Sequence, residues 1–270
     1  MRIANIQIQS SDQLSENLTK MEGYVKRVRD AGAQLAVFPE MAYYTSKRSG
    51  LAPVLARFSE IQSMFQQWAE KYQIALIPGT LREPQPQNPE KFFNTLLCFD
   101  SKGNLAAKYQ KIFRFQARLP HHTYDEAQFC EAGHQVITCQ LGDFKLGFAI
   151  CFDLRFPELF RSLRKQGAQV LIVPSAFTVP TGQAHWEVLL RSRAIENQCY
   201  LIASDQTSIS GEGLGQYGHS LSIDPWGTIL GRENEAEGYH LVDVSTQRIE
   251  EVRSQINAWQ SRNEALFPIP

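Results

Sequence analysis

Three side chains, far apart in the chain, carry the groups that an acyl-transfer reaction needs. Cys151 in "GFAICFDLRFPELF" provides a thiol, Glu40 in "VFPEM" a carboxylate and Lys111 in "AAKYQKIFRF" an ammonium group. A thiol with a pKa of about 8.5 becomes a good nucleophile near neutral pH only beside a base or a positive charge. Glu40 could accept the thiol proton, while Lys111 and the backbone N–H of Phe152 could stabilise an oxyanion. These residue types therefore divide the work of acyl transfer.

Each of the three residues also has an ordinary interpretation when it is taken alone. Free cysteine is among the residue types most often buried, where it packs as a small hydrophobic side chain. A glutamate after an apolar strand is commonly a solvated loop residue, and a lysine past a hairpin strand is commonly a solvated strand end. The chemical interpretation therefore requires a fold that brings Glu40, Lys111 and Cys151 together.

The elements that would position these residues occur twice along the chain. "AGAQLAVFPE" (31–40) and "QGAQVLIVPS" (166–175) each follow a helical pattern and end an apolar strand in proline, with Gly32 and Gly167 where helix C-terminal glycines belong. "WAEKYQIALIPGT" is likewise echoed by "RAIENQCYLIASDQT", and "NTLLCFDSKGNLAAKY" by "GHSLSIDPWGTILG". Each half is therefore predicted to run strand, helix, strand, helix, strand, hairpin.

This repeat predicts an α/β fold in which two sheets pack face to face with helices outside. Ligands of open α/β sheets gather beyond the carboxyl ends of the strands. Glu40, Cys151 and Ser175 all fall at such ends. The predicted topology thus places the candidate base and the candidate nucleophile at the strand ends where such ligands gather.

The composition is that of a folded globular chain. Its 270 residues are 43% hydrophobic and 20% charged, and no Pro/Gly/Ser-rich tract separates two different halves, so we expect a single domain over residues 1–270. The net charge is -1 and there is no basic stripe, which argues against nucleic acid as a partner. The N-terminus alternates apolar and polar residues, as a strand does, and lacks the continuous apolar region of a secretory signal peptide. No apolar run approaches the roughly 18 residues that a membrane-spanning helix needs.

The cysteines favour a reducing compartment. There are five of them, an odd number without a CxxC pair, so we expect no disulfide framework and a cytoplasmic protein. Cys199 opens a buried strand with no acid or histidine placed to activate it, and Cys98 and Cys139 lie inside β-patterns, so core packing is the expected role of all three.

The histidines of the sequence suggest two other kinds of site. A Cys/His pair could recruit His185 of "GQAHWEVL", although capping and pocket lining are simpler roles for a histidine at the start of a helix. A zinc site could be imagined from His121, His122, Cys130 and His134, but these spacings match no common ligand pattern. We therefore expect no metal and no cofactor.

The sequence blocks around the three candidate residues resemble a known family. "VFPE", "YQKIFRF" and "CFDLRFPEL" are similar to the three catalytic blocks of the carbon–nitrogen hydrolase (nitrilase) superfamily, in the family's order and over essentially the whole chain. The resemblance implies duplicated αββα layers that form a four-layer α-β-β-α sandwich, and a homodimer or higher homo-oligomer. It also implies roles: Cys151 as nucleophile, Glu40 as general base, Lys111 as the oxyanion-stabilising residue. Glu126 in "YDEAQFCEAG" would be the family's second glutamate, which orients lysine and substrate.

The resemblance extends to a substrate class. The segment 174–200 most resembles the branch that hydrolyses deaminated glutathione, in which the terminal amino group of glutathione has become a 2-oxo group. The ω-amidases, which act on 2-oxoglutaramate, carry a similar cysteine block and remain an alternative, as do nitrile or carbamoyl substrates and a non-catalytic binding protein of the same fold. After Lys111 the chain departs from the family, with His121 for a glycine and Ala127 for a serine, so the loop 118–126 leaves the substrate less defined than the reaction.

Arg155, four residues after the cysteine, is the candidate for the substrate carboxylate, because a guanidinium offers a planar pair of donors. The alternative role for Arg155 is that of an arginine at the start of a helix, paired with Glu158. The full set of expected substrate-binding residues is Tyr43, Phe152, Arg155, Ser175, Phe177 and His185.

The C-terminal segment has an amphipathic pattern of its own. Ile249, Val252, Ile256 and Trp259 recur at helical spacing. We expect this extension, from about residue 246, to lie at a subunit interface.

Overall fold

The computed structural model describes residues 1–45, 52–119, 122–208 and 215–269. Its helices and strands, in chain order, are β1 (Arg2–Gln7), α1 (Leu14–Asp30), β2 (Leu35–Val37), α2 (Ala52–Leu55), α3 (Phe58–Tyr72), β3 (Ala75–Ile77), β4 (Thr80–Pro84), β5 (Phe92–Phe99), β6 (Leu105–Gln110), β7 (Gln116–Leu119), β8 (His122–Asp125), η2 (Glu126–Gln128), β9 (Cys130–Glu131), β10 (Thr138–Leu141), β11 (Phe144–Phe148), η3 (Cys151–Arg155), α4 (Pro157–Lys165), β12 (Val170–Ile172), α5 (Val179–Asn197), β13 (Tyr200–Ala203), β14 (Leu221–Ile223), β15 (Ile229–Arg232), β16 (Gly238–Asp243) and α6 (Thr246–Gln255).

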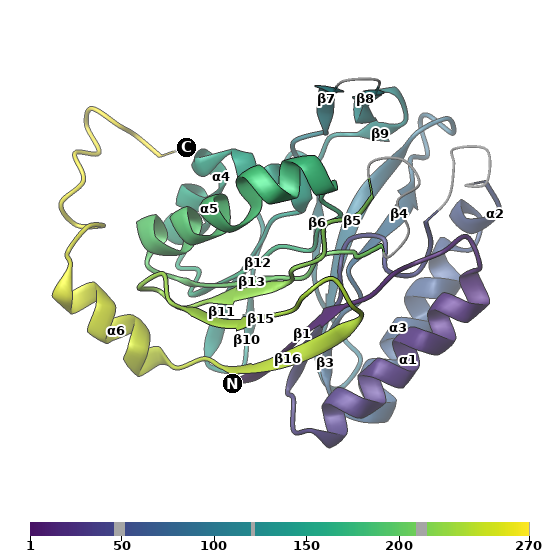
Figure 1. Cartoon of the computed structure of the whole chain (residues 1–270), viewed down its shortest axis with the longest axis horizontal. Helices are drawn as coiled ribbons and strands as arrows, with labels where there is room; N and C mark the ends of the chain where they lie inside the picture. The colour runs from purple at the N-terminus through teal and green to yellow at the C-terminus, as the bar shows by residue number, and fades with distance from the viewer. Residues whose placement is uncertain (46–51, 120–121, 209–214, 270) are drawn as a thin grey trace.

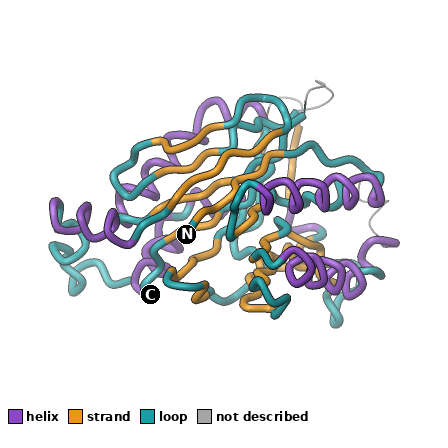
Figure 2. The backbone as a smooth tube through the Cα atoms, turned by 90° about the horizontal axis from the view of Figure 1, so that it is seen from below, coloured by secondary structure: helices purple, strands orange, loops and turns teal. Residues whose placement is uncertain are grey.

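Two large sheets form the centre of the molecule. The first has the strand order β16-β1-β2-β3-β5-β4, with β6 and β9 also paired to β5, and the second has the order β10-β11-β12-β13-β14-β15. Helices α1 and α3 lie outside the first sheet, and α4 and α5 lie outside the second (Figure 1). Seen from below, the strands form two layers with helices on the outer sides (Figure 2). The predicted four-layer α-β-β-α sandwich is confirmed.

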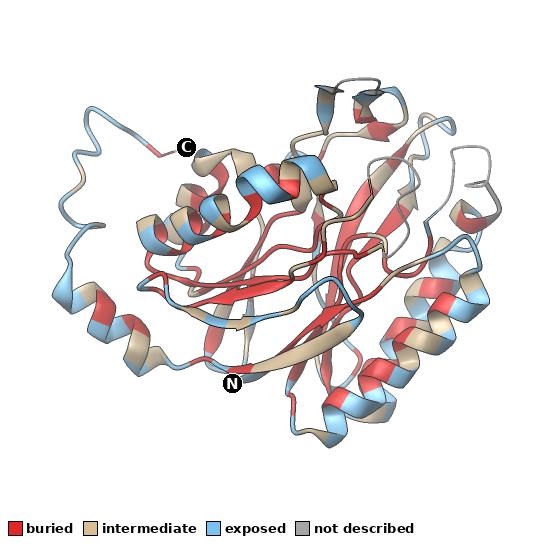
Figure 3. Ribbon diagram, viewed as in Figure 1, coloured by how far each residue is buried: buried red, intermediate tan, exposed pale blue. Residues whose placement is uncertain are grey.

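Three apolar layers hold this sandwich together. One lies between α1, α3 and the first sheet, the second between the two sheets, and the third between the second sheet and α4, α5. Alternate residues of each strand face opposite layers: in β2, Ala36 faces the helices while Leu35 and Val37 face the other sheet. Buried residues accordingly line both faces of the sheets and the inner faces of the helices (Figure 3).

The internal repeat predicted from the sequence is present in the structure. β1, β2 and β3 are parallel, and so are β11, β12 and β13. Gly32 and Gly167 follow α1 and α4 with φ of 87° and 91°, and Gln73 and Gln198 both end their helices in the left-handed region. The strand β16 was not part of the predicted repeat: it pairs antiparallel with β1 and so joins the end of the chain to the first sheet.

The C-terminal helix is shorter than its sequence pattern suggested. α6 ends at Gln255, so Ile256 and Trp259 do not continue the helical face that was predicted for them. The side-chain amide of Gln198 donates to the carbonyl oxygen of Ile256 at 2.6 Å, which satisfies one of the open carbonyl groups at the helix end. Ile249 and Val252 are buried against the rest of the chain. A subunit interface at this segment stays a prediction.

Among the described residues, no helix combines the length and the apolar character that crossing a bilayer requires.

Candidate active site

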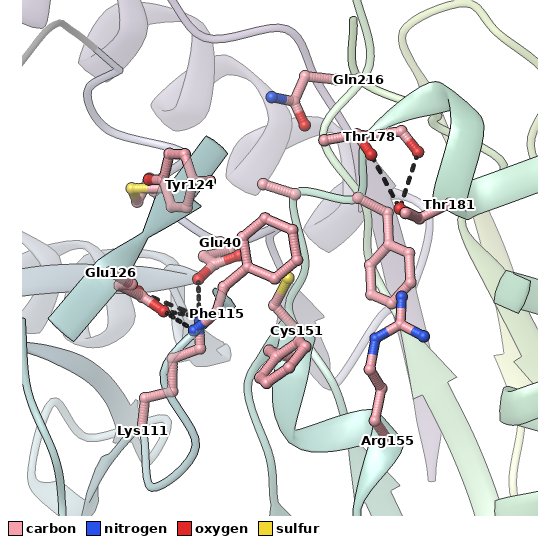
Figure 4. Close-up of a pocket in the computed structure, with 14 residues that line it drawn as sticks. Glu40, Lys111, Phe115, Tyr124, Glu126, Cys151, Arg155, Thr178, Thr181 and Gln216 are labelled. Atoms are coloured by element: carbon pink, nitrogen blue, oxygen red, sulfur yellow. Dashed lines mark hydrogen bonds and ion pairs between the residues drawn. The ribbon is translucent and has the colours of Figure 1, made fainter. Parts of the chain in front are cut away.

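The ammonium group of Lys111 lies between two buried carboxylates. Its Nζ atom is 3.3 Å from Oε1 of Glu40 and 2.9 Å from Oε2 of Glu126, and all three side chains are at most 8% exposed (Figure 4). Burial alone lowers the pKa of Lys111, but the charges of Glu126 and Glu40 outweigh it and hold that pKa well above its usual value. Lys111 is therefore a permanent cation in the site.

The local backbone explains why Glu40 and Lys111 meet. Glu40 follows β2 in a turn that packs on Gly79, where a Cβ atom would lie 1.8 Å from the carbonyl oxygen of Pro39. Lys111 directly follows β6, and its backbone N–H donates to the carbonyl oxygen of Asn94 at 2.9 Å. The side chain of Asn94 donates to Oε1 of Glu40 at 2.7 Å, so a single residue of β5 fixes both partners.

Cys151 occupies a constrained turn after β11. Its φ angle is 47°, in the left-handed region that non-glycine residues rarely adopt, and its backbone N–H donates to the carbonyl oxygen of Pro174 at 3.0 Å. Strained residues of this kind cluster at active sites, where the surrounding structure holds them in place. The sequence predicted a strand end followed by a helix, and the structure places the short helix η3 between β11 and α4.

The electrostatic surroundings keep the Cys151 thiol protonated at rest. Burial and the charge of Glu40 raise its pKa well above the usual value, while Lys111 lowers it. A thiol of this kind can act as a nucleophile only if a base removes its proton as the new bond forms. Glu40 and Cys151 line the same cavity, which is the arrangement that such a transfer requires.

The cavity that holds these residues has a volume of about 190 Å³. Cys151 lies between a side formed by Glu40, Lys111 and Glu126 and a side formed by Arg155 and Thr181 (Figure 4). The remaining wall is largely aromatic, with neutral hydrogen-bonding groups, and consists of Phe115, Tyr124, Phe152, Phe177, Thr178, Gln216, Met41 and Ala176. Such a pocket suits a small ligand whose polar groups meet the charged side chains on either side of Cys151 and whose carbon chain packs on the aromatic wall.

Three of the expected substrate-binding residues line the cavity, namely Phe152, Phe177 and Arg155. Arg155 forms no ion pair with Glu158 among the described residues; instead its Nη1 atom is 3.3 Å from Nδ1 of His185, and its guanidinium lies over the rings of Phe152 and Phe177. The alternative role of Arg155, a helix-start arginine paired with Glu158, is therefore not the one that the described structure shows.

The other three expected substrate-binding residues do not line it. Met41, with φ of 54°, reverses the chain after Glu40, so Tyr43 points into the core, where its hydroxyl accepts a hydrogen bond from the backbone N–H of Arg82. Ser175 is fully buried and its hydroxyl donates to the carbonyl oxygen of Val173. His185 reaches the site only through Arg155.

Sequence reasoning also missed residues that organise the site. The backbone N–H of Phe115 donates to Oε2 of Glu126 at 2.6 Å, and the side-chain amide of Gln206 donates to the carbonyl oxygen of Glu40 at 3.0 Å. Asn94 is a polar residue inside the apolar run "FFNTLLCF", and that interruption was the available signal. Phe115 acts through its backbone N–H and Gln206 bonds to a backbone oxygen, so neither contact leaves a mark in the residue pattern.

The alternative sites are not assembled in the described structure. Cys199 is fully buried, and its thiol donates to the carbonyl oxygen of Ala168 at 3.1 Å. Of the zinc candidates, His121 and the side chain of His122 lie outside the described residues, while Cys130 is buried and His134 is exposed. No group of three or more histidine, cysteine or acidic side chains in the described residues is arranged to hold a metal ion.

A four-layer sandwich with a cysteine, a lysine and two glutamates around one cavity is the arrangement implied by the resemblance to carbon–nitrogen hydrolases. Residues 2–254 match that family, and the chain belongs to it. It is a hydrolase that acts on carbon–nitrogen bonds.

Three relatives illustrate the similarity. The deaminated glutathione amidase of Synechocystis sp. is 36% identical over 263 residues, which cover 96% of this chain and 97% of the relative. The human omega-amidase NIT2 is 30% identical, covering 99% of this chain and 97% of the relative. The crystal structure of the C. elegans NitFhit protein superimposes with a TM-score of 0.93 at 32% identity, covering 99% of this chain and 66% of that one.

Proposed function

We propose that this protein is a thiol-dependent amidase that hydrolyses the amide bond of a small 2-oxo acid, and that deaminated glutathione is its preferred substrate. The observation that carries the proposal is the state of Arg155. The cavity is lined by two cationic side chains, and Lys111 is already neutralised by Glu40 and Glu126. Arg155 has no carboxylate partner among the described residues, so its charge is available to a ligand.

The surroundings of Arg155 favour a ligand carboxylate. Burial lowers the pKa of Arg155, which reflects a guanidinium that has lost water without gaining an anion. His185, as an acceptor, and the two aromatic rings hold the guanidinium plane in one orientation. A planar pair of N–H donors matches the geometry of a carboxylate. The terminal carboxylate of a 2-oxo acid amide would bind there, with its amide carbon at Cys151.

The reaction then proceeds through a thioester. Glu40 takes the thiol proton as the sulfur of Cys151 attacks the amide carbon, and Lys111 and the N–H of Phe152 stabilise the oxyanion. When the carbon–nitrogen bond breaks, Glu40 returns that proton to the departing amine. Glu40 next takes a proton from water, whose oxygen attacks the thioester carbon. As the carbon–sulfur bond breaks, Glu40 gives that proton to the departing sulfur of Cys151. The sum is amide plus water giving acid plus amine.

The choice among substrates is tested by kinetics on three amides. The deaminated glutathione amidase of Synechocystis sp. supports the larger substrate, whereas the omega-amidase NIT2 supports 2-oxoglutaramate. We expect kcat/KM to be higher for deaminated glutathione than for 2-oxoglutaramate, and higher for both than for glutamine, because unpaired buried donors penalise a substrate that lacks the matching groups. A preference for 2-oxoglutaramate would make the protein an ω-amidase. Turnover of nitriles alone would contradict the amidase proposal.

Arg155 provides the sharpest single test of the substrate class. We expect Arg155→Leu to lower kcat/KM for both 2-oxo acid amides by about 100-fold, on the scale of a lost charge-assisted pair. Hydrolysis of an uncharged amide such as propionamide should change by less than about threefold, because that substrate does not use the guanidinium. Equal losses on charged and uncharged amides would show that Arg155 supports the structure of the site and does not bind the carboxylate.

A further inference from the structure

Asp153 is a buried carboxylate that the proposed reaction does not use. It lies two residues after Cys151 in η3 and is fully buried. Its Oδ1 atom accepts a hydrogen bond from the backbone N–H of Phe113 at 2.8 Å. Its Oδ2 atom accepts two more, from the backbone N–H of Ile150 at 2.8 Å and from the hydroxyl of Tyr109 at 2.7 Å. One side chain thus satisfies three buried donors.

The position of these donors along the chain gives Asp153 a role in the site. Tyr109 lies two residues before Lys111 and Phe113 two residues after it, while Ile150 directly precedes Cys151. These bonds therefore join the segment that carries the ammonium group to the segment that carries the thiol. The other described contacts between the two segments are apolar ring contacts, Phe113 on Phe156 and Phe115 on Phe152. Lys111 itself bonds to Glu40 and Glu126, which lie on the first half of the chain.

We propose that Asp153 is a positioning residue for the amidase, whose carboxylate sets the distance between the Lys111 ammonium and the Cys151 thiol. This inference rests on the proposed function, since it assigns Lys111 and Cys151 their parts in acyl transfer. A shift of about 1 Å in such a pair is enough to cost catalysis on the order of 100-fold. Asp153 acts through its neighbours and does not contact the substrate, because it does not line the cavity.

The charge of Asp153 connects this role to pH. Burial raises the pKa of Asp153 to about 6, although the bonds from Tyr109, Phe113 and Ile150 lower it. Above about pH 6 the carboxylate accepts three charge-assisted hydrogen bonds, which are roughly twice as strong as neutral ones. Protonation weakens them and adds a buried O–H donor. Activity should therefore fall as the pH drops through about 6.

Other charged groups surround Asp153 and have to be separated from it in any test. Tyr109 and Lys111 face it from the β6 segment. Cys151 and Arg155 lie on the same short helix, and Arg193 of α5 donates to the carbonyl oxygen of Leu154 beside it. Of these, only Tyr109 bonds directly to the carboxylate through its side chain, so removing that hydroxyl changes Asp153 while leaving the other charges in place.

The first test uses Tyr109→Phe. Loss of a hydrogen bond to the charged form raises the pKa of Asp153, so the acid limb of kcat/KM should move upward by about one pH unit. An acid limb that belonged to Glu40 or Glu126 would not move. A limb that stays in place in Tyr109→Phe therefore overturns the assignment of the limb to Asp153.

The second test uses Asp153→Asn and measures Cys151 directly. An amide places an N–H group against one of the three donors, so we expect kcat/KM to fall about 30-fold and the Lys111 segment to shift. Because Lys111 lowers the pKa of Cys151, the pH profile of Cys151 alkylation by iodoacetamide should then move to higher pH. An unchanged alkylation profile, with turnover within about threefold of the parent, overturns the proposal.

A matched control separates the effect on the two pH profiles from a general loss of stability. Asp224 is also buried and also accepts backbone N–H bonds, from Trp226 and Thr228, but in the β14–β15 turn away from the cavity. Asp224→Asn should lower stability without moving the acid limb or the alkylation profile. The alkylation assay needs no substrate, so it tests Asp153 even if the proposed amide is never hydrolysed.

Discussion

Cys151→Ala is expected to abolish amide hydrolysis, with a loss of at least about 10⁴-fold in kcat. In the proposed reaction the thioester is the only route from amide to acid. Among the described residues that line the cavity, no other cysteine, serine or lysine combines a left-handed backbone turn after a strand with a neighbouring carboxylate that could act as its base. Amine release would be followed by chromatography. Intact-mass measurement would show an acyl adduct on the parent protein during turnover and none on the variant.

Cys199→Ala is the matched control for this experiment. Cys151 follows strand β11 of the second sheet, and Cys199 directly precedes strand β13 of the same sheet. Cys199 is fully buried, and burial raises its pKa. The substitution deletes a small buried atom, so we expect a loss of about 1 kcal/mol in the free energy of unfolding and turnover within about twofold. Comparable losses of activity in the two variants would contradict the assignment of Cys151 as nucleophile.

The fold could be predicted because its elements repeat patterns that depend only on local chemistry. Apolar residues at helical spacing before Gly32 and Gly167, and short apolar strands after them, define the same unit in both halves. Two such units, each with one apolar sheet face left over, can bury those faces against each other. The positions of Glu40 and Cys151 at strand ends follow from that arrangement.

The rest of the site depends on contacts between residues far apart in sequence, which no local pattern encodes. Asn94 reaches Glu40 across 54 positions, and Asp153 reaches Tyr109 across 44. Tyr43 was misplaced for a different reason: the left-handed turn at Met41 changes the direction of the chain, and a strand-end pattern does not reveal backbone angles. Similarly, α6 ends where Gln198, a residue of another element, caps it.

Lys111→Met is the second substitution with a large expected effect, and it should change activity and stability together. In the proposed reaction Lys111 is an oxyanion donor, and removing its ammonium group also raises the pKa of the Cys151 thiol further, so we expect kcat/KM to fall about 10³-fold. It also leaves Glu40 and Glu126 buried without a cation. Breaking a buried ion pair in this way should lower the free energy of unfolding by about 3 kcal/mol, measured by urea denaturation.

The double variant Lys111→Met/Glu126→Gln separates the two effects. Glu126→Gln removes one of the two stranded charges, while its amide oxygen still accepts the hydrogen bond from the backbone N–H of Phe115. We expect at least half of the lost stability to return, because the cost came from uncompensated charge and not from lost packing. Activity should stay about 10³-fold low, because no cation has been restored beside the oxyanion. Recovery of turnover with stability would mean that Lys111 serves the fold alone, and its catalytic role would have to be abandoned.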